Sequence, residues 1–282
     1  MLPVMAPARW QAEMIERARH VARSDARIRA VWLGGSFGSG EQDEFSDVDL
    51  HCLVDATQRN WFADHWRDLA RQVAGAPLVL ARDIPGVLGG YVLTDRFRHL
   101  DLIVHAQLTA RSLPADELYH GHPSLVLYDP DRLLPPPPAR AAAGGAYFPS
   151  DPVTFFFYLL HAFSVSMQRG ELALARAGVP AVQDPLVAVM LAENGVRQRG
   201  GNKRLNRYLT AEQRDCLEQL PATDGSAAAT IAAIAYLTRE FIGRGRRLAK
   251  ATGQAWPRDL ETAALAHLHA TLGIDPAAWR PG

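Results

Sequence analysis

Hydrophobic residues in the first half of the chain follow two periods, one helical and one extended. Residues 8–23 and 57–74 place apolar side chains at helical spacing, as with Trp10, Met14 and Ala18, which predicts two amphipathic helices. Five short apolar runs predict β-strands; they are residues 28–33, 48–54, 78–81, 90–94 and 99–106. This order of elements predicts an α+β domain in which helices pack on a mixed sheet.

The pattern changes near residue 140. Residues 133–138 end in four consecutive prolines, which neither a helix nor a central strand accommodates, and small flexible residues follow. We therefore expect two domains, at residues 1–140 and 141–282. Beyond the boundary the strand signals fade and helical spacing takes over, which predicts an all-α helical bundle.

Capping residues predict where the helices of the second half begin. Residues 151–177 and 184–198 each begin with Asp-Pro, an N-cap followed by proline at the first helical position. Thr210 with Gln213 resembles a capping box and opens a third helix. The remaining helices are predicted at residues 226–251 and 257–272.

Residues 155–158 form an unusual run, Phe-Phe-Phe-Tyr. Four consecutive aromatic side chains cover every side of a helix, which favours burial of this helix in the core. The alternative is that one or two of these rings line a pocket for an acceptor substrate.

Composition narrows the class of protein. The 282 residues carry no formal net charge, with 15 basic and 18 acidic side chains in residues 1–140 and 15 and 12 in the rest. A neutral chain favours neither nucleic acid nor a membrane surface as a partner. Cys52 and Cys216 suit no disulfide framework or zinc site. With no signal pattern and no uncharged apolar run of membrane-spanning length, we expect a cytoplasmic protein.

Most candidate metal-binding and phosphate-binding residues lie in one motif. A Gly/Ser turn, residues 34–40 (GGSFGSG), precedes Asp47 and Asp49, which stand two residues apart at the start of a predicted strand. Two carboxylates on one face repel each other unless a cation lies between them, and Mg²⁺ prefers such oxygen ligands. The turn offers backbone N–H groups that suit phosphate, with Gly35, Ser36 and Gly40 as candidates. His51, which follows on the same strand, is expected to face away from these carboxylates.

Asp101 is the candidate third carboxylate. It stands inside the apolar strand 99–106, where a charge is costly to bury without a partner. A shared metal ion, or a proton to be accepted, would explain its presence. The alternative is a structural ion pair with Arg96 or Arg98.

These residues resemble the signature of the nucleotidyltransferase superfamily related to DNA polymerase β. Gly35-Ser36, Gly40, residues 46–50 (SDVDL) and Asp101 match that signature, and the acidic loop 41–45 resembles the bacterial antibiotic nucleotidyltransferases. The resemblance implies Mg²⁺ as cofactor and a nucleoside triphosphate, with ATP first, as co-substrate. It also implies an acceptor hydroxyl on an aminoglycoside or a lincosamide.

The chain departs from this group at Ser39, where members often carry arginine before the glycine. The missing charge has a candidate supplier in a basic segment between two predicted helices, at residues 197–207. The segment resembles the lysine-bearing stretch that contacts the triphosphate in related enzymes, so we expect Lys203, Arg204 and Tyr208 to bind nucleotide. The alternative is a solvated basic loop.

The mechanism implied is an in-line attack of the acceptor hydroxyl on the α-phosphorus, with pyrophosphate leaving. Asp101 is the first candidate for the base that takes the hydroxyl proton. Glu193 is the second, because its helix precedes the basic segment. The alternative for Glu193 is a solvated helix residue.

Three functions remain open at this point. The first is transfer of a nucleoside monophosphate to a small molecule such as an antibiotic. The second is modification of a protein or tRNA, but no extended basic face favours nucleic acid. The third is a non-catalytic nucleotide-binding protein, against which Asp47 and Asp49 both argue. A homodimer with a shared acceptor pocket is compatible with the antibiotic group.

Overall fold

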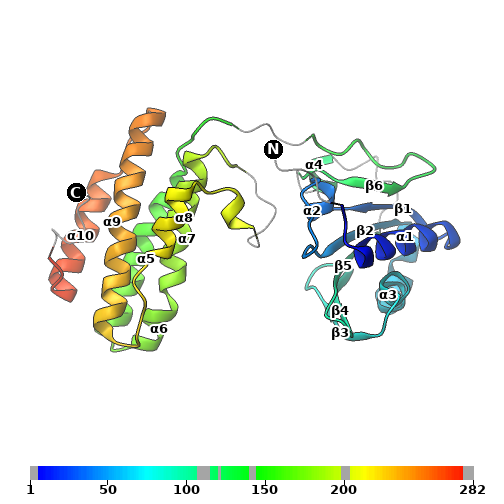
Figure 1. Ribbon diagram of the computed structural model, residues 1–282, viewed down its shortest axis with the longest axis horizontal. Coiled ribbons are helices and arrows are strands. Elements are labelled where there is room, and N and C mark those ends of the chain that lie inside the picture. Colours follow the sequence, from blue (N-terminus) through cyan, green and yellow to red (C-terminus); the bar gives the residue numbers. More distant parts are fainter. Residues whose placement is uncertain (1–5, 107–114, 120–121, 140–143, 198–203, 276–282) are drawn as a thin grey trace. The chain divides into compact units, whose positions relative to one another are not determined.

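The computed structural model describes residues 6–106, 115–119, 122–139, 144–197 and 204–275 (Figure 1). Its contacts divide the chain into two compact units, Met1–Ala141 and Ala142–Gly282, and each unit has its own hydrophobic core. The sheet belongs to the first unit, and every element described in the second is helical.

The first unit contains a six-stranded sheet in the order β3-β4-β5-β2-β1-β6. Its strands are β1 (Ile28–Leu33), β2 (Val48–Val54), β3 (Leu78–Asp83), β4 (Gly89–Thr94), β5 (His99–Ala106) and β6 (Leu125–Tyr128). β2 and β5 are parallel neighbours and the other pairings are antiparallel, so the sheet is mixed, as the sequence predicts. β6, which pairs with β1, was not among the predicted strands.

The two faces of this sheet bury different clusters. The helical elements of the unit are α1 (Arg9–Ser24), α2 (Gly35–Gly38), η1 (Ala56–Gln58), α3 (Arg59–Ala74) and α4 (Ala115–Tyr119). α1 and α3 lie side by side and cover one face, where Met14 and Trp66 pack with Leu50 of β2 (Figure 1). Trp32 and Leu53 belong to a second cluster, which packs with α4.

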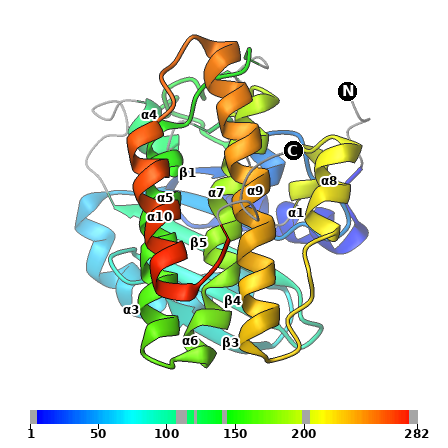
Figure 2. The same ribbon diagram turned by 90° about the vertical axis from the view of Figure 1, so that its left-hand side faces the viewer.

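The second unit is built from helices. They are α5 (Ser150–Gln168), α6 (Leu172–Ala177), α7 (Val179–Glu193), η3 (Leu205–Arg207), α8 (Ala211–Glu218), α9 (Ala227–Thr252) and α10 (Arg258–Leu272). α10 packs on α5, α5 on α7, and α7 on α9, so these four long helices run side by side (Figure 2). In the core, Phe156 of α5 stacks on Phe241 of α9 with ring centroids 3.7 Å apart, so these two helices are also in contact.

The second Asp-Pro pair does not begin a helix. α7 begins at Val179, ends at Glu193 rather than near residue 198, and contains Pro185 in its interior. Proline removes one intrahelical hydrogen bond, the one to the carbonyl of Ala181. Ala181 is exposed, so water can satisfy that carbonyl, while the buried face of α7 outweighs the local signal.

The first Asp-Pro pair lies inside the first turn of α5, whose N-cap is Pro149 rather than Asp151. The single helix expected over residues 151–177 is two helices, because the chain turns at Gly170 with φ +73°. The capping box is confirmed: Thr210 accepts from the backbone N–H of Gln213 at 3.2 Å, and the Gln213 side chain accepts from Thr210 in return.

One segment of the described chain is long and apolar enough to span a membrane. Leu172–Glu193 has a mean hydropathy of 1.2 and is half buried inside the unit. The core helix of a globular protein has the same properties, and α7 contributes Leu186 and Met190 to the hydrophobic core. The segment is therefore weak evidence for a membrane span.

Candidate active site

The parallel pairing of β2 with β5 brings the predicted carboxylates together. Asp49 and Asp101 are register partners, next to the buried pair Val48 and Leu100. Because side chains alternate along a strand, Asp49 and Asp101 share the face opposite to the one that these apolar residues bury. Asp47 immediately precedes β2 and lies at the same end of the strand.

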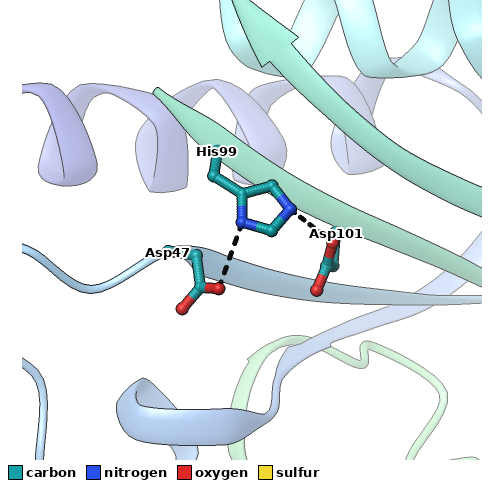
Figure 3. Close-up of side chains that lie close together, drawn as sticks. All are labelled: Asp47, His99 and Asp101. Atoms are coloured by element: carbon teal, nitrogen blue, oxygen red, sulfur yellow. Dashed lines mark ion pairs between the residues drawn. The ribbon is translucent and has the colours of Figure 1, made fainter. Parts of the chain in front are cut away.

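His99 lies between two of the carboxylates, as Figure 3 shows. Its Nδ1 is 3.2 Å from Oδ2 of Asp47, and its Nε2 is 2.9 Å from Oδ1 of Asp101. The alternative partners considered for Asp101, Arg96 and Arg98, are wrong, because the ion-pair partner of Asp101 is this histidine. A histidine two residues before Asp101 therefore links β5 to the start of β2.

The two carboxylates make His99 cationic at neutral pH. Pairing with Asp101 and then with Asp47 raises the pKa of His99 to about 9, against a smaller opposing effect of burial. The imidazolium neutralises one of the two negative charges that would otherwise repel each other. This arrangement can hold both carboxylates in place before a metal ion binds.

The same residues fit a divalent metal ion. One donor atom each from Asp47, His99 and Asp101 lies within 4.8 Å of the others. Nε2 of His99 is buried, and despite its short distance to Asp101 it is not aligned for a hydrogen bond. Two carboxylate oxygens with one imidazole nitrogen suit a divalent cation, which the imidazole binds only after it has lost its proton.

Asp49 lies outside this set of three and close to Gly35. A Cβ at Gly35 would lie 1.9 Å from Oδ2 of Asp49, so a side chain there would displace the carboxylate. Gly35 also has φ +51°, in the left-handed region that favours glycine. Glycine at this position avoids backbone strain and leaves the Asp49 carboxylate in place, so the backbone of the turn can approach it.

The turn presents polar groups beside Asp49. Among the described residues, the backbone N–H groups of Gly35 and Ser36 donate to no carbonyl, and Oγ of Ser36 is buried without a hydrogen-bond partner. Successive N–H groups of this kind bind anions. The Gly35–Ser36 part of the predicted phosphate turn thus has the groups that phosphate oxygens need.

Gly40 and Ser39 play a different part in the turn. Gly40 has φ +68°, but a Cβ there would meet nothing within 4 Å, so its glycine is explained by conformation alone. Oγ of Ser39 donates to the carbonyl of Ser36 at 3.2 Å. Ser39 therefore closes the turn and, unlike an arginine, supplies no positive charge.

A buried glutamine holds the loop that leads to Asp47. Nε2 of Gln11, on α1, donates to the carbonyls of Asp43 and Ser46 at 2.8 and 2.7 Å. Oγ of Ser46 donates to Oδ1 of Asp43 and accepts from its backbone N–H. These bonds fix the loop 41–46 and with it the position of Asp47.

His51 does not face away from the carboxylates, contrary to the sequence-based expectation. Residues 49 and 51 stand two apart on β2 and therefore share a face. Both lie near Gly34, where an added Cβ would be 2.9 Å from Nε2 of His51 and 3.9 Å from Cβ of Asp49. The His51 ring stacks on Trp32, and its Nδ1 is 3.0 Å from Nε2 of His105. Strand alternation thus places His51 on the face of Asp49, and the expectation was wrong.

In the second unit, Glu193 is not a solvated helix residue. Its Oε2 pairs with Arg244 at 3.0 Å and accepts from Nε2 of Gln213 at 2.8 Å. Arg244 is 3 % exposed and also pairs with Glu212. Glu193 therefore belongs to a partly buried network that joins α7, α8 and α9.

The predicted nucleotide-binding segment is described only in part. Lys203 lies outside the described residues. Arg204 precedes η3, and Tyr208 follows it. The side-chain amide of Asn194 donates to the carbonyl of Tyr208 at 2.8 Å, which attaches this segment to the end of α7.

Two residues of the site were missed in the sequence. His99 carries a signal that could have identified it, because a residue two positions before Asp101 on a strand shares its face. Gln11 carries none, since a glutamine within an amphipathic helix usually faces solvent.

The sequence matches one family of known proteins over most of its length. The model of the family described as streptomycin adenylyltransferase matches residues 8–271. No curated protein matches the sequence. An aminoglycoside 6-adenyltransferase from Bacillus subtilis is 15% identical with a TM-score of 0.42, covering 94% of this chain and 99% of that one. A nucleotidyltransferase-like protein from Exiguobacterium sibiricum is 10% identical with a TM-score of 0.32, covering 92% and 88%.

Proposed function

Because the chain belongs to the streptomycin adenylyltransferase family and is thus an adenylyltransferase, we propose that it transfers AMP from ATP to a hydroxyl of an aminoglycoside such as streptomycin. The observation that carries this proposal is the group of Asp47, His99 and Asp101, with Asp49 beside the turn at Gly35. Residues 1–140 would form the catalytic domain and residues 141–282 a helical bundle.

We assign the metal site to the end of β2 and β5 that carries the carboxylates. Asp47 and Asp101 would hold Mg²⁺, with His99 or Asp49 completing the set according to which side chain turns toward it. A bound divalent cation neutralises the charge that phosphate oxygens carry into the site and develop during transfer. When it is bound, His99 no longer has to neutralise the carboxylates.

The chain's own groups would bind and orient the nucleotide. The N–H groups of Gly35 and Ser36, with Oγ of Ser36, would donate to oxygens at the β/γ end of the triphosphate. Gly40 allows the chain to leave this turn. Lys203, Arg204 and Tyr208 would supply positive charge and a further contact to the triphosphate; this part of the proposal rests on the sequence.

Asp101 is the favoured base. The acceptor oxygen forms a bond to the α-phosphorus, the bond to pyrophosphate breaks, and the hydroxyl proton passes to a carboxylate. Asp101 is 28% exposed and can therefore be reached by an acceptor. Glu193 already accepts from Gln213 and pairs with Arg244, so we assign it to positioning the segment around Tyr208.

We place this activity in the cytoplasm, where ATP and Mg²⁺ are abundant, and expect no nucleic-acid partner from the neutral charge of the chain. A homodimer is compatible with the proposal but not required by it.

The test is transfer of label from each of the four nucleoside triphosphates to a panel of aminoglycosides and lincosamides in Mg²⁺. We expect ATP with an aminoglycoside to give product. Asp49→Asn should abolish transfer while leaving the circular dichroism spectrum and melting temperature unchanged. Full activity in Asp49→Asn, or product only with a protein or tRNA acceptor, would overturn the proposal.

A further inference from the structure

A second candidate binding site lies within the helical unit. The N-terminal halves of α5 and α7 border an open pocket of about 790 Å³. This volume is within the range of about 300–1,000 Å³ that small-molecule sites occupy. Its lining includes Asp151, Phe155 and Tyr158 from α5, with Asp184 and Pro185 from α7.

Two aromatic rings are exposed in this pocket. Phe155 and Tyr158 are 52% and 62% exposed, whereas their neighbours Phe156 and Phe157 are buried in the core. The exposed rings lie almost parallel, with centroids 5.8 Å apart. Two adjacent exposed rings form an apolar surface on which a ligand can pack.

Two carboxylates border the same pocket. Asp151 and Asp184 are exposed, and within the described residues neither makes an ion pair. No arginine, lysine or histidine is among the described residues that line the pocket. Asp151 lies in the first turn of α5, where the helix dipole favours a negative charge. Asp184 lies beyond the first turn of α7, so the dipole does not account for its charge.

We propose that this pocket binds an organic cation, and specifically the amine- or guanidinium-bearing rings of the aminoglycoside acceptor. The aromatic faces of Phe155 and Tyr158 attract a cation, and Asp151 and Asp184 pair with its charges. The pocket thus combines an apolar surface with negative charge, which excludes nucleotide phosphates and favours a polycation. The identity of the ligand rests on the proposed function; the site itself rests on these residues.

The test is calorimetric binding of streptomycin to the full chain without nucleotide or Mg²⁺, with maltotriose as an uncharged control. We expect streptomycin to bind and maltotriose not to bind. Asp184→Asn should weaken binding about fivefold, and Tyr158→Ala about fivefold, whereas Tyr158→Phe, which keeps the ring, should bind like the wild type.

Asp259→Asn is the matched control, since it removes an exposed aspartate from the first turn of α10 in the same unit. Equal affinities for Asp184→Asn, Tyr158→Ala and Asp259→Asn, or no binding of streptomycin, would overturn the site. If Asp184→Asn and Tyr158→Ala weaken streptomycin binding but the wild type transfers no AMP, the pocket is a binding site and the proposed function is contradicted. AMP transfer by Asp184→Asn and Tyr158→Ala with an unchanged KM for streptomycin would contradict the pocket as a binding site and keep the proposed function.

Discussion

The two candidate sites of this protein are built in opposite ways. In the first unit, Asp47 and Asp101 stand at the ends of paired strands, are partly buried, and are bridged by His99. In the second, Asp151 and Asp184 are exposed on two helices and make no ion pair among the described residues. This difference follows from the role that we propose for each pair. Carboxylates that hold a metal ion for catalysis need a fixed position before the ion binds, whereas carboxylates that only attract a charged ligand can remain exposed to solvent.

The largest effect expected from this comparison separates turnover from affinity. Asp101→Asn should lower kcat by about 10³-fold or more, because it removes the proposed metal ligand and the proposed base together. Asp184→Asn should leave kcat nearly unchanged and raise KM about fivefold. Steady-state kinetics of both variants with ATP and streptomycin measure this, and equal losses of kcat in the two would end the distinction between the sites.

Glycine at position 35 gives the next largest effect, with Gly40 as its control. Gly35→Ala places a Cβ on the Asp49 carboxylate in a left-handed backbone, whereas Gly40→Ala meets the left-handed backbone alone. We expect Gly35→Ala to lower kcat/KM about 100-fold, and Gly40→Ala to cost about 1 kcal/mol of stability with little loss of activity. Chemical denaturation and kinetics of the two variants check this; similar activities would mean that the close approach of Gly35 to Asp49 is unimportant.

Gln11 provides a smaller effect that acts through position. Gln11→Ala removes the amide that donates to Asp43 and Ser46, so the loop before Asp47 should loosen. The free energy of unfolding should fall by about 2 kcal/mol. Affinity for Mn²⁺, measured by electron paramagnetic resonance as a substitute for Mg²⁺, should fall about tenfold. An unchanged Mn²⁺ affinity in a folded variant would show that the loop does not position Asp47.

The smallest effect is the pH dependence of stability without metal. The folded pKa of His99 is about 9, above its ordinary value of 6.5. Its contribution to stability is therefore fully present below pH 6.5 and is lost as the pH rises through 9. In EDTA the melting temperature of the wild type should fall over this range more than that of His99→Gln. If the melting temperatures of the wild type and of His99→Gln fall equally with pH, His99 does not bridge Asp47 and Asp101.

Much of the first unit could be predicted because its strands are apolar runs with clear ends. The bounds of β1, β2 and β5 match the sequence prediction. The motif at the start of β2 made Asp47 and Asp49 candidates, and the charge inside the apolar run 99–106 made Asp101 one. The register between β2 and β5 could not be predicted, since it depends on which strands become neighbours. The contact of His99 with Asp47 could not be predicted for that reason, because Asp47 comes from another element.

The helical unit was less predictable because local signals compete with burial. Asp184 and Pro185 form a strong start signal, yet α7 begins at Val179 and buries Pro185. The aromatic run at 155–158 was expected in the core, and the structure divides it between core and pocket. Helical periodicity identifies the apolar face of a helix, but the positions of the neighbouring helices determine which part of that face is buried.

The most direct measurement of the central claim follows the two ends of ATP. The full chain is incubated with streptomycin, Mg²⁺ and ATP labelled at either the α- or the γ-phosphate. The account predicts that the α-label appears on the aminoglycoside and the γ-label only in pyrophosphate, and that Asp47→Asn transfers neither. A γ-label on the acceptor, or undiminished transfer by Asp47→Asn, would contradict it.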